Sequence, residues 1–155
     1  MQPETVFSHA GTAAMAGWLV LILGPRGYAW LNAVPRWVIP GGLSAAYALI
    51  VLSRFAEADG GFGSLAAVAS LMSNDWALLA GWVHYLAFDL FIGAVMARRM
   101  DQVGISRVVQ APILGATFML GPIGFLIAGL TELGLRTAGL PSQRLSAEGS
   151  LHVRL

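Results

Sequence analysis

Four apolar segments, separated by polar or glycine-rich stretches, dominate this sequence. They cover approximately residues 7–23, 38–56, 75–97 and 112–131. A helix of about 20 apolar residues rises roughly 30 Å, which is the thickness of the hydrocarbon core of a bilayer. The pattern therefore predicts an all-α membrane protein in which four transmembrane helices form a bundle.

Local signals indicate where these helices begin, end and bend. Gly24 and Pro25 close the first segment, and Asn74 is placed to cap the third. Residues 64–73 carry apolar side chains at helical spacing, which predicts a short interfacial helix between the second and third segments. Pro122 falls at the midpoint of the fourth segment, where we expect it to bend a continuous helix.

The expected organisation is one transmembrane domain over residues 1–132 and a polar tail over residues 133–155. No basic region precedes or opens the first apolar segment, and Glu4 and His9 lie there instead, so no cleavable signal peptide is expected. Five of the nine arginines fall in the first and third loops. Because arginine is enriched in cytoplasmic loops, this favours both chain ends on the outer side.

Composition supports the membrane class and excludes several others. Hydrophobic residues make up 57% of the chain and charged residues 11%, whereas a soluble domain usually carries about 25% charged residues. With a net charge of +1 and no basic run, no nucleic-acid partner is expected. The absence of cysteine excludes disulfides, thiolate catalysis and cysteine-ligated metals. The basic residues are all arginine, and alanine and glycine are abundant, which favours a bacterial inner (cytoplasmic) membrane.

Two polar residues, His84 and Asp89, lie near the middle of the third apolar segment. A charged group at that depth costs at least ~2.5 kcal/mol on insertion scales, so such residues are candidate functional groups. A helix turns by about 100° per residue, which places Trp82, Tyr85 and Asp89 on one face and His84 about 140° away from Asp89. The two residues are therefore not expected to act on one substrate atom.

In a bundle, the midpoints of the four helices would meet in one layer. Its expected side chains are Tyr47, Trp82, His84, Tyr85, Phe88, Asp89, Thr117 and Pro122. This mixture of apolar surface and few polar atoms suits a long, apolar ligand. The alternative is structural, because a buried aspartate can hydrogen-bond a neighbouring helix and a lone histidine can do the same.

No metal or cofactor is predicted. Haem ligation by His84 would usually need a second histidine at similar depth, and His9 lies nearer the outer surface. His9, Asp75 and Glu132 are expected to gather at the outer interface, where charged groups are commonly solvated rather than metal-bound.

Two runs of residues resemble a known family. The run from Trp82 to Phe91, with the pattern W-x-H-x-L-x-x-D-L, resembles the signature of the "abscisic acid deficient four" family, also called neoxanthin-synthase-like. The run from Phe118 to Phe125, which contains G-P-x-G, is similar to that family's second block, and residues 7–25 look like its first span. The resemblance covers most of residues 3–132 and implies a four-span integral membrane protein.

The resemblance also implies a chemistry. Plant members are plastid proteins needed to form neoxanthin from violaxanthin, a conversion that opens an epoxide and removes a nearby proton without net redox change. It requires a general acid at the epoxide oxygen and a base at a polyene carbon. The resemblance supplies the positions and not the roles, and we assign protonated Asp89 as the acid and neutral His84 as the base. Violaxanthin is not an expected bacterial pigment, so a β-ring carotenoid or another polyene isoprenoid is the expected ligand.

Three hypotheses follow. The first is a membrane protein that binds and isomerises or otherwise modifies a carotenoid or isoprenoid lipid, with His84 and Asp89 catalytic and the other residues of the layer binding substrate. The second is a non-enzymatic membrane subunit or pigment-binding scaffold. The third is oxidative cleavage of β-ring carotenoids, which needs an oxidant that the sequence does not display. A homo-oligomer or a larger membrane complex is compatible with each.

Overall fold

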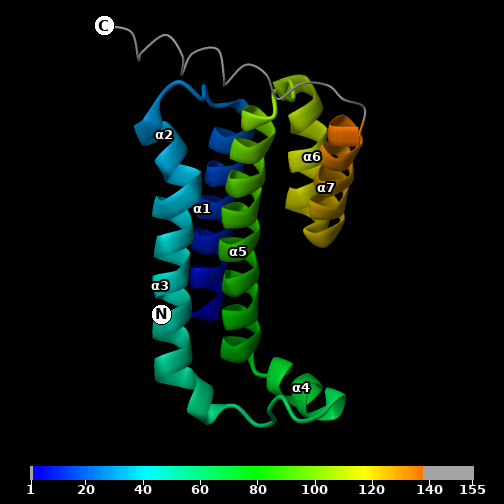
Figure 1. The fold of residues 1–155 in the computed structure, drawn as a ribbon. Helices are drawn as coiled ribbons and strands as arrows, with labels where there is room; N and C mark the ends of the chain where they lie inside the picture. Colours follow the sequence, from blue (N-terminus) through cyan, green and yellow to red (C-terminus); the bar gives the residue numbers. More distant parts are fainter. Residues whose placement is uncertain (1, 138–155) are drawn as a thin grey trace, which may run out of the picture. The chain divides into compact units, whose positions relative to one another are not determined.

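The computed structural model describes residues 2–137, which form helices and no strand (Figure 1). The chain divides into two compact units, Met1–Ala94 and Val95–Leu155. Among the described residues, three helices are long and apolar enough to cross a membrane: Pro3–Leu23, Ala29–Glu57 and Asp75–Gln102. The all-helical membrane class is therefore confirmed, whereas the expected count of four spans is not.

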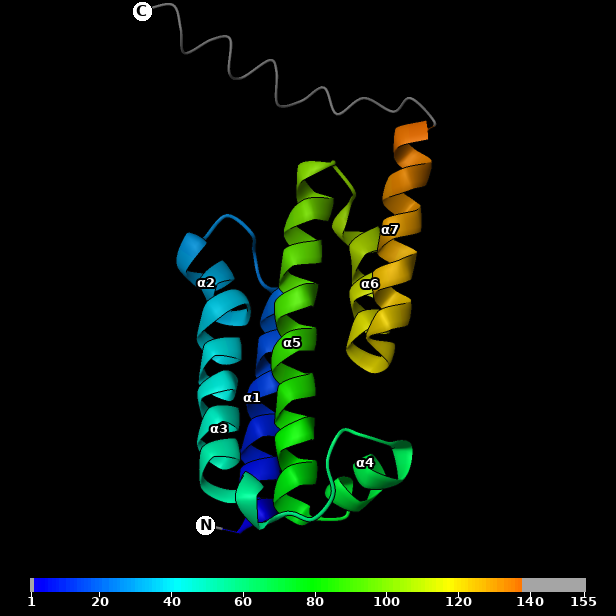
Figure 2. The ribbon, with the colours of Figure 1, turned by 60° about the horizontal axis from the view of Figure 1, so that its bottom comes forward.

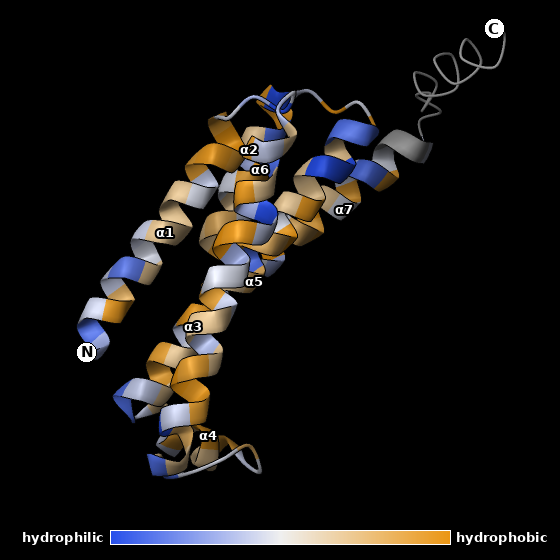
Figure 3. Cartoon of the chain, turned by 90° about the vertical axis from the view of Figure 1, so that its left-hand side faces the viewer, coloured by the Kyte–Doolittle hydropathy of each residue, from blue (hydrophilic) through white to orange (hydrophobic). Residues whose placement is uncertain are grey.

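The first long helix, α1, covers Pro3–Leu23. Proline suits its first turn because the N–H that proline lacks would have no partner there. The helix ends where Gly24 and Pro25 follow, and the Gly24 N–H donates to the Val20 carbonyl at 2.9 Å. Its hydrophilic residues gather toward its N-terminal end and its C-terminal half is hydrophobic (Figure 3).

The second long helix begins earlier than expected, at Ala29 rather than near residue 38. It consists of α2 (Ala29–Ala33), a π-helical turn η1 (Val34–Val38), α3 (Ile39–Arg54) and a 3-10 turn η2 (Phe55–Glu57). In the π turn the Ile39 N–H donates to the Val34 carbonyl, five residues back. Pro35 and Pro40 each remove a hydrogen-bond donor, and the wider π turn accommodates this loss without ending the helix.

A short helix, α4 (Leu65–Met72), lies in the connection to the third long helix and begins at an N-cap in which the Ser64 hydroxyl accepts from the Ala67 N–H at 3.1 Å. The third long helix, α5, covers Asp75–Gln102. Asn74 caps it, because its side-chain oxygen accepts from the N–H groups of Trp76 and Ala77 at 3.0 and 3.2 Å. Both caps satisfy donors that a helix start leaves unpaired.

In the first unit, α1, α3 and α5 lie side by side (Figures 1 and 2). Many of the residues in their buried cluster are alanines, and its members are Ala10, Ala14, Leu43, Ile50, Leu79, Ala80, Val83, Leu86 and Ala87. Glycines bring α1 and α5 closest, since Gly17 packs against Leu90 and Gly93 packs against the Trp18 ring. Small residues at helix contacts allow this approach in membrane proteins.

The second unit corrects the expectation of one bent helix over residues 112–131. The chain forms two helices, α6 (Arg107–Leu120) and α7 (Pro122–Thr137), and reverses between them at Gly121, whose φ is +32°. The two helices lie side by side (Figures 1 and 2), and Gly124 packs directly against the backbone of Thr117. Pro122 opens α7, where its missing N–H is not needed.

Two polar contacts hold this unit together. The buried Gln110 donates from Nε2 to the Asp101 carboxylate at 2.7 Å and to the Ile105 carbonyl at 2.8 Å, which ties the α5–α6 loop to α6. The polar tail expected from residue 133 begins inside α7. Its part beyond Thr137 lies outside the described residues.

Candidate functional site

His84 lies on the side of α5 that contacts α3. Its ring centroid is 5.4 Å from that of Tyr47 on α3, and 4.5 Å from that of Phe88, on which it stacks at an interplanar angle of 21°. The His84 side chain is exposed within the described chain. An imidazole on such a surface is accessible to a ligand that approaches this side of α5.

A different side of α5 carries the remaining candidates from the third segment. Trp82 contacts Tyr85 and also Phe7 on α1, each with a centroid distance of 5.6 Å. The Tyr85 hydroxyl is a hydrogen-bond partner of the Asp89 carboxyl group. The other carboxyl oxygen, Oδ2 of Asp89, is buried and has no hydrogen-bond partner within the described part of the chain.

The predicted acid and base consequently do not converge. Both lie on α5, where five residues separate them by about 7.5 Å along the axis and about 140° around it. His84 contacts α3, whereas Asp89 belongs with Tyr85 and Trp82. A single substrate atom cannot reach both side chains in this arrangement.

The His84 side continues into a cleft of about 240 Å³ between the second long helix and α5. The residues that line this α3–α5 cleft are Arg36, Trp37, Pro40, Gly41, Ser44, Ala87, Phe88 and Phe91. The rings of Trp37 and Phe91 meet across it at 5.5 Å, and Phe88 joins it to His84. An aromatic cleft with few polar groups suits an apolar ligand.

The comparisons with known proteins place the chain in a family. A family model described as ABA DEFICIENT 4-like matches residues 5–127. The chain belongs to this family. No curated protein matches it, and no solved structure matches it. The ABA DEFICIENT 4-like match includes the whole of the α3–α5 cleft together with His84, Tyr47 and Asp89.

The sequence indicated only part of this cleft. Of the predicted site residues, Phe88 lines the cleft, and His84 and Tyr47 lie beside it through ring contacts. Arg36 and Trp37 precede the expected second segment, residues 38–56, so the sequence placed them in the connection before it. The spacing of two prolines five residues apart, which permits a π turn, is the signal that could have kept them in the helix.

The ABA DEFICIENT 4-like region holds a second cleft, of about 330 Å³, beside the start of α5. Its lining residues are Pro3, Glu4, Phe7, Asp75, Leu78, Leu79 and Trp82. The cleft lies between the N-terminal part of α1 and the side of α5 that carries Trp82. Asp75 therefore lies near Glu4, and His9 instead places its Nδ1 atom 2.7 Å from the Thr5 carbonyl of its own helix.

Thr117 and Pro122 belong to the second unit. The Thr117 side chain is buried and its hydroxyl donates to the Ile113 carbonyl at 2.8 Å. Pro122 is exposed at the start of α7. Both residues shape the α6–α7 turn, and their contact with a ligand stays a prediction.

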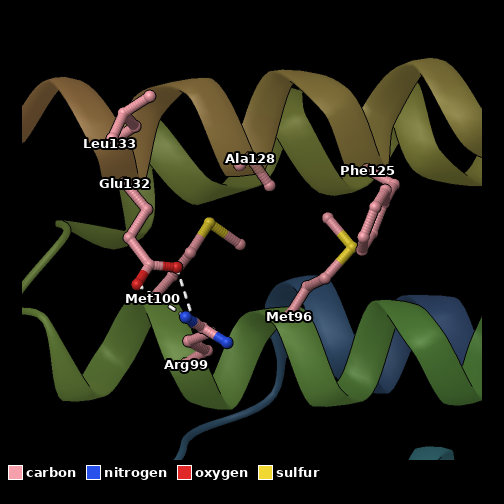
Figure 4. A pocket seen from close by; sticks show the side chains of 8 residues that line it. Met96, Arg99, Met100, Phe125, Ala128, Glu132 and Leu133 are labelled. Atoms are coloured by element: carbon pink, nitrogen blue, oxygen red, sulfur yellow. Dashed lines mark hydrogen bonds and ion pairs between the residues drawn. The ribbon is translucent and has the colours of Figure 1, made fainter.

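A third cavity, of about 320 Å³, lies in the second unit between α7 and the end of α5 (Figure 4). Met96, Met100 and Phe125 contribute apolar side chains to it. Arg99 and Glu132 form an ion pair at one end, with Nε–Oε2 at 2.5 Å and Nη2 donating to Oε1 at 2.9 Å. Within this unit Glu132 thus pairs with Arg99 of α5, and its expected gathering with His9 and Asp75 stays a prediction.

Proposed function

We propose that this ABA DEFICIENT 4-like protein binds one end of a carotenoid, or of another polyene isoprenoid, in the α3–α5 cleft and isomerises it beside His84. The observation that carries the proposal is that Phe88, which lines the aromatic cleft, stacks on His84, whose ring lies in turn beside that of Tyr47. Membership of the ABA DEFICIENT 4-like family supports the ligand class, because the resemblance links its plant members to the formation of neoxanthin. The arginine-only basic composition supports a bacterial inner membrane as the location.

The size of the cleft supports partial enclosure of the ligand. Its volume of about 240 Å³ is below the 300–1,000 Å³ typical of pockets that enclose a drug-sized molecule. A forty-carbon polyene is larger than that, so one end ring enters the cleft and the remaining chain lies against the helices in the bilayer. The rings of Trp37, Phe88 and Phe91 offer apolar surface to such an end ring.

The arrangement supports a revised pair of catalytic groups. Neutral His84 accepts the proton from a polyene carbon, and the Tyr47 hydroxyl donates a proton to the oxygen of the opening epoxide. Imidazolium then returns a proton to the phenolate, so protons and electrons balance without an oxidant. Asp89 acts on no atom of a ligand in this cleft and supports Tyr85 on the other side of α5.

A pigment-binding scaffold is the second candidate, because the exposed His84 ring stacked on Phe88 also forms a platform for a conjugated chain without proton transfer. Expression in cells that accumulate β-carotene and epoxy-carotenoids, followed by pigment profiling, tests both functions. A new isomer that requires His84 supports catalysis, and co-purified pigment with an unchanged profile supports the scaffold. Neither turnover nor co-purified pigment would reject carotenoid binding altogether.

A further inference from the structure

Arg36 lines the α3–α5 cleft from within the π turn. Its guanidinium carbon lies 5.1 Å from the centroid of the Trp37 ring, a distance at which a cation is attracted to an aromatic face. Its Nε atom is buried and has no hydrogen-bond partner within the described part of the chain. The charged group is thus held in place by stacking but is not fully satisfied by hydrogen bonds.

An unpaired, buried donor of a charged group is costly, because the folded state does not replace the hydrogen bond that water supplied. The described residues that line the cleft include no carboxylate that could pair with Arg36. Ser44 adds a hydroxyl to the same lining. The cleft is therefore complementary to a ligand group that carries negative charge and accepts hydrogen bonds.

The position of Arg36 along the helix agrees with such a group. The second long helix covers Ala29–Glu57, so its midpoint is near Leu43 and Arg36 lies about 11 Å from that midpoint along the helix axis. Half of a hydrocarbon core is about 15 Å. The long side chain of Arg36 is therefore within reach of the head groups, where anionic groups of amphiphiles are found.

We propose that the Arg36 end of the α3–α5 cleft is an anion subsite. It binds a carboxylate or phosphate at the end of an amphiphile whose apolar part lies along Trp37, Phe91 and Phe88. The inference rests on the proposed function in assuming that this cleft takes a lipid, and it adds the chemistry of the polar end. The guanidinium fork of arginine matches the two oxygens of either anion.

The test compares two polyenes that share one skeleton and differ at one end, all-trans-retinoic acid and all-trans-retinol. Binding to the purified full-length protein in neutral detergent is measured by quenching of tryptophan fluorescence. The wild type should bind the acid about tenfold more tightly than the alcohol, the effect of one charge-assisted hydrogen bond. Arg36→Gln should abolish this preference by weakening the binding of the acid, and circular dichroism shows whether the variant is folded. Arg54→Gln, at the exposed end of α3, is the matched control and should retain the preference.

A second arm identifies the source of the anion. Competition of phosphatidylglycerol with retinoic acid in the wild type, lost in Arg36→Gln, would assign the subsite to a head-group phosphate. An Arg36-dependent preference for the acid without such competition would assign it to the ligand's own carboxylate. Equal affinity for acid and alcohol, no effect of Arg36→Gln and no competition would overturn the anion subsite while leaving the proposed function intact. Failure of both polyenes to bind the wild type would overturn the two together.

Discussion

The indole ring of Trp18 on α1 lies directly against Gly93 on α5, so closely that a Cβ atom at residue 93 would overlap the ring. Trp18 is buried, and its side chain therefore has little room to move away. The contact brings a large aromatic ring against bare backbone. Such close packing supplies dispersion energy that helps to hold two membrane helices together. This matters because lipid tails are as apolar as the side chains, so the hydrophobic effect does not drive the helices together.

Gly93→Ala should destabilise the protein by about 1–3 kcal/mol, the range for overpacking of a well-packed contact. Gly11→Ala on α1 is the matched control, since no atom lies within 4 Å of a Cβ at that position. It should leave stability unchanged or raise it by up to about 1 kcal/mol, because alanine favours helix over glycine. Unfolding in mixed micelles with increasing sodium dodecyl sulfate measures both. Equal effects would show that the ring contact does not limit the helix spacing.

His84→Gln and Tyr47→Phe should each lower carotenoid conversion by about 10²–10⁴-fold, the usual contribution of a general acid or base. Asp89→Asn should lower it less than about tenfold, because Asp89 lies on another side of α5 from the cleft. Pigment profiles at matched protein levels measure the conversion, and circular dichroism checks the fold. A large loss in Asp89→Asn with normal activity in Tyr47→Phe would instead favour the acid–base pair inferred from the sequence.

The α6–α7 pair is expected to enter and leave the membrane on one side. Its helices have 14 and 16 residues and rise about 21 and 24 Å, less than the ~30 Å of the hydrocarbon core. The chain lacks cysteine, so single-cysteine variants report membrane sides cleanly. Ser106→Cys and Gly134→Cys should react with a membrane-impermeant maleimide from the same side, and Ile123→Cys at the turn should stay unreactive.

Labelling of Ser106→Cys and Gly134→Cys from opposite sides would show a fourth crossing. Both ends of the chain would then lie on the same side of the membrane. Labelling from the same side leaves three crossings, with the two ends of the chain on opposite sides. Intact spheroplasts and inverted vesicles provide the two orientations needed for this measurement. Ser106 suits the test because its side chain makes no capping hydrogen bond that cysteine would lose.

Gly124→Ala should disrupt the turn between α6 and α7. A Cβ at this position would overlap backbone atoms of Thr117, which cannot move aside as a flexible side chain could. We expect the free energy of unfolding to fall by more than about 3 kcal/mol, which is the upper end of the usual cost of overpacking, or the two helices to separate. Gly129→Ala on the same helix is the control, because nothing lies within 4 Å of a Cβ there. Limited proteolysis at the Gly121 turn measures the opening, and equal protection of the two variants would contradict the close contact.

Several features could be predicted from the sequence alone, because they depend on residues that are close together in the chain. The length and apolarity of residues 7–23 and 75–97 indicated α1 and α5, and Asn74 indicated the cap of α5. Helical geometry alone separated His84 from Asp89, because positions five residues apart on one helix point in different directions. These properties depend on residues close together in the chain.

The remaining features depend on contacts between helices, which no local pattern determines. A proline in an apolar segment is compatible with a kink, a π turn or a new helix, and packing selects among them. Gly124 against Thr117 selected a new helix after Gly121, whereas a continuous π turn holds Pro35 within the second long helix. The sequence by itself thus determined α1, α5 and the faces of α5. Only the tertiary structure decided that Arg36 and Phe88 line one cleft and that His84 stacks beside it on Phe88, because residues on two helices meet there only through packing.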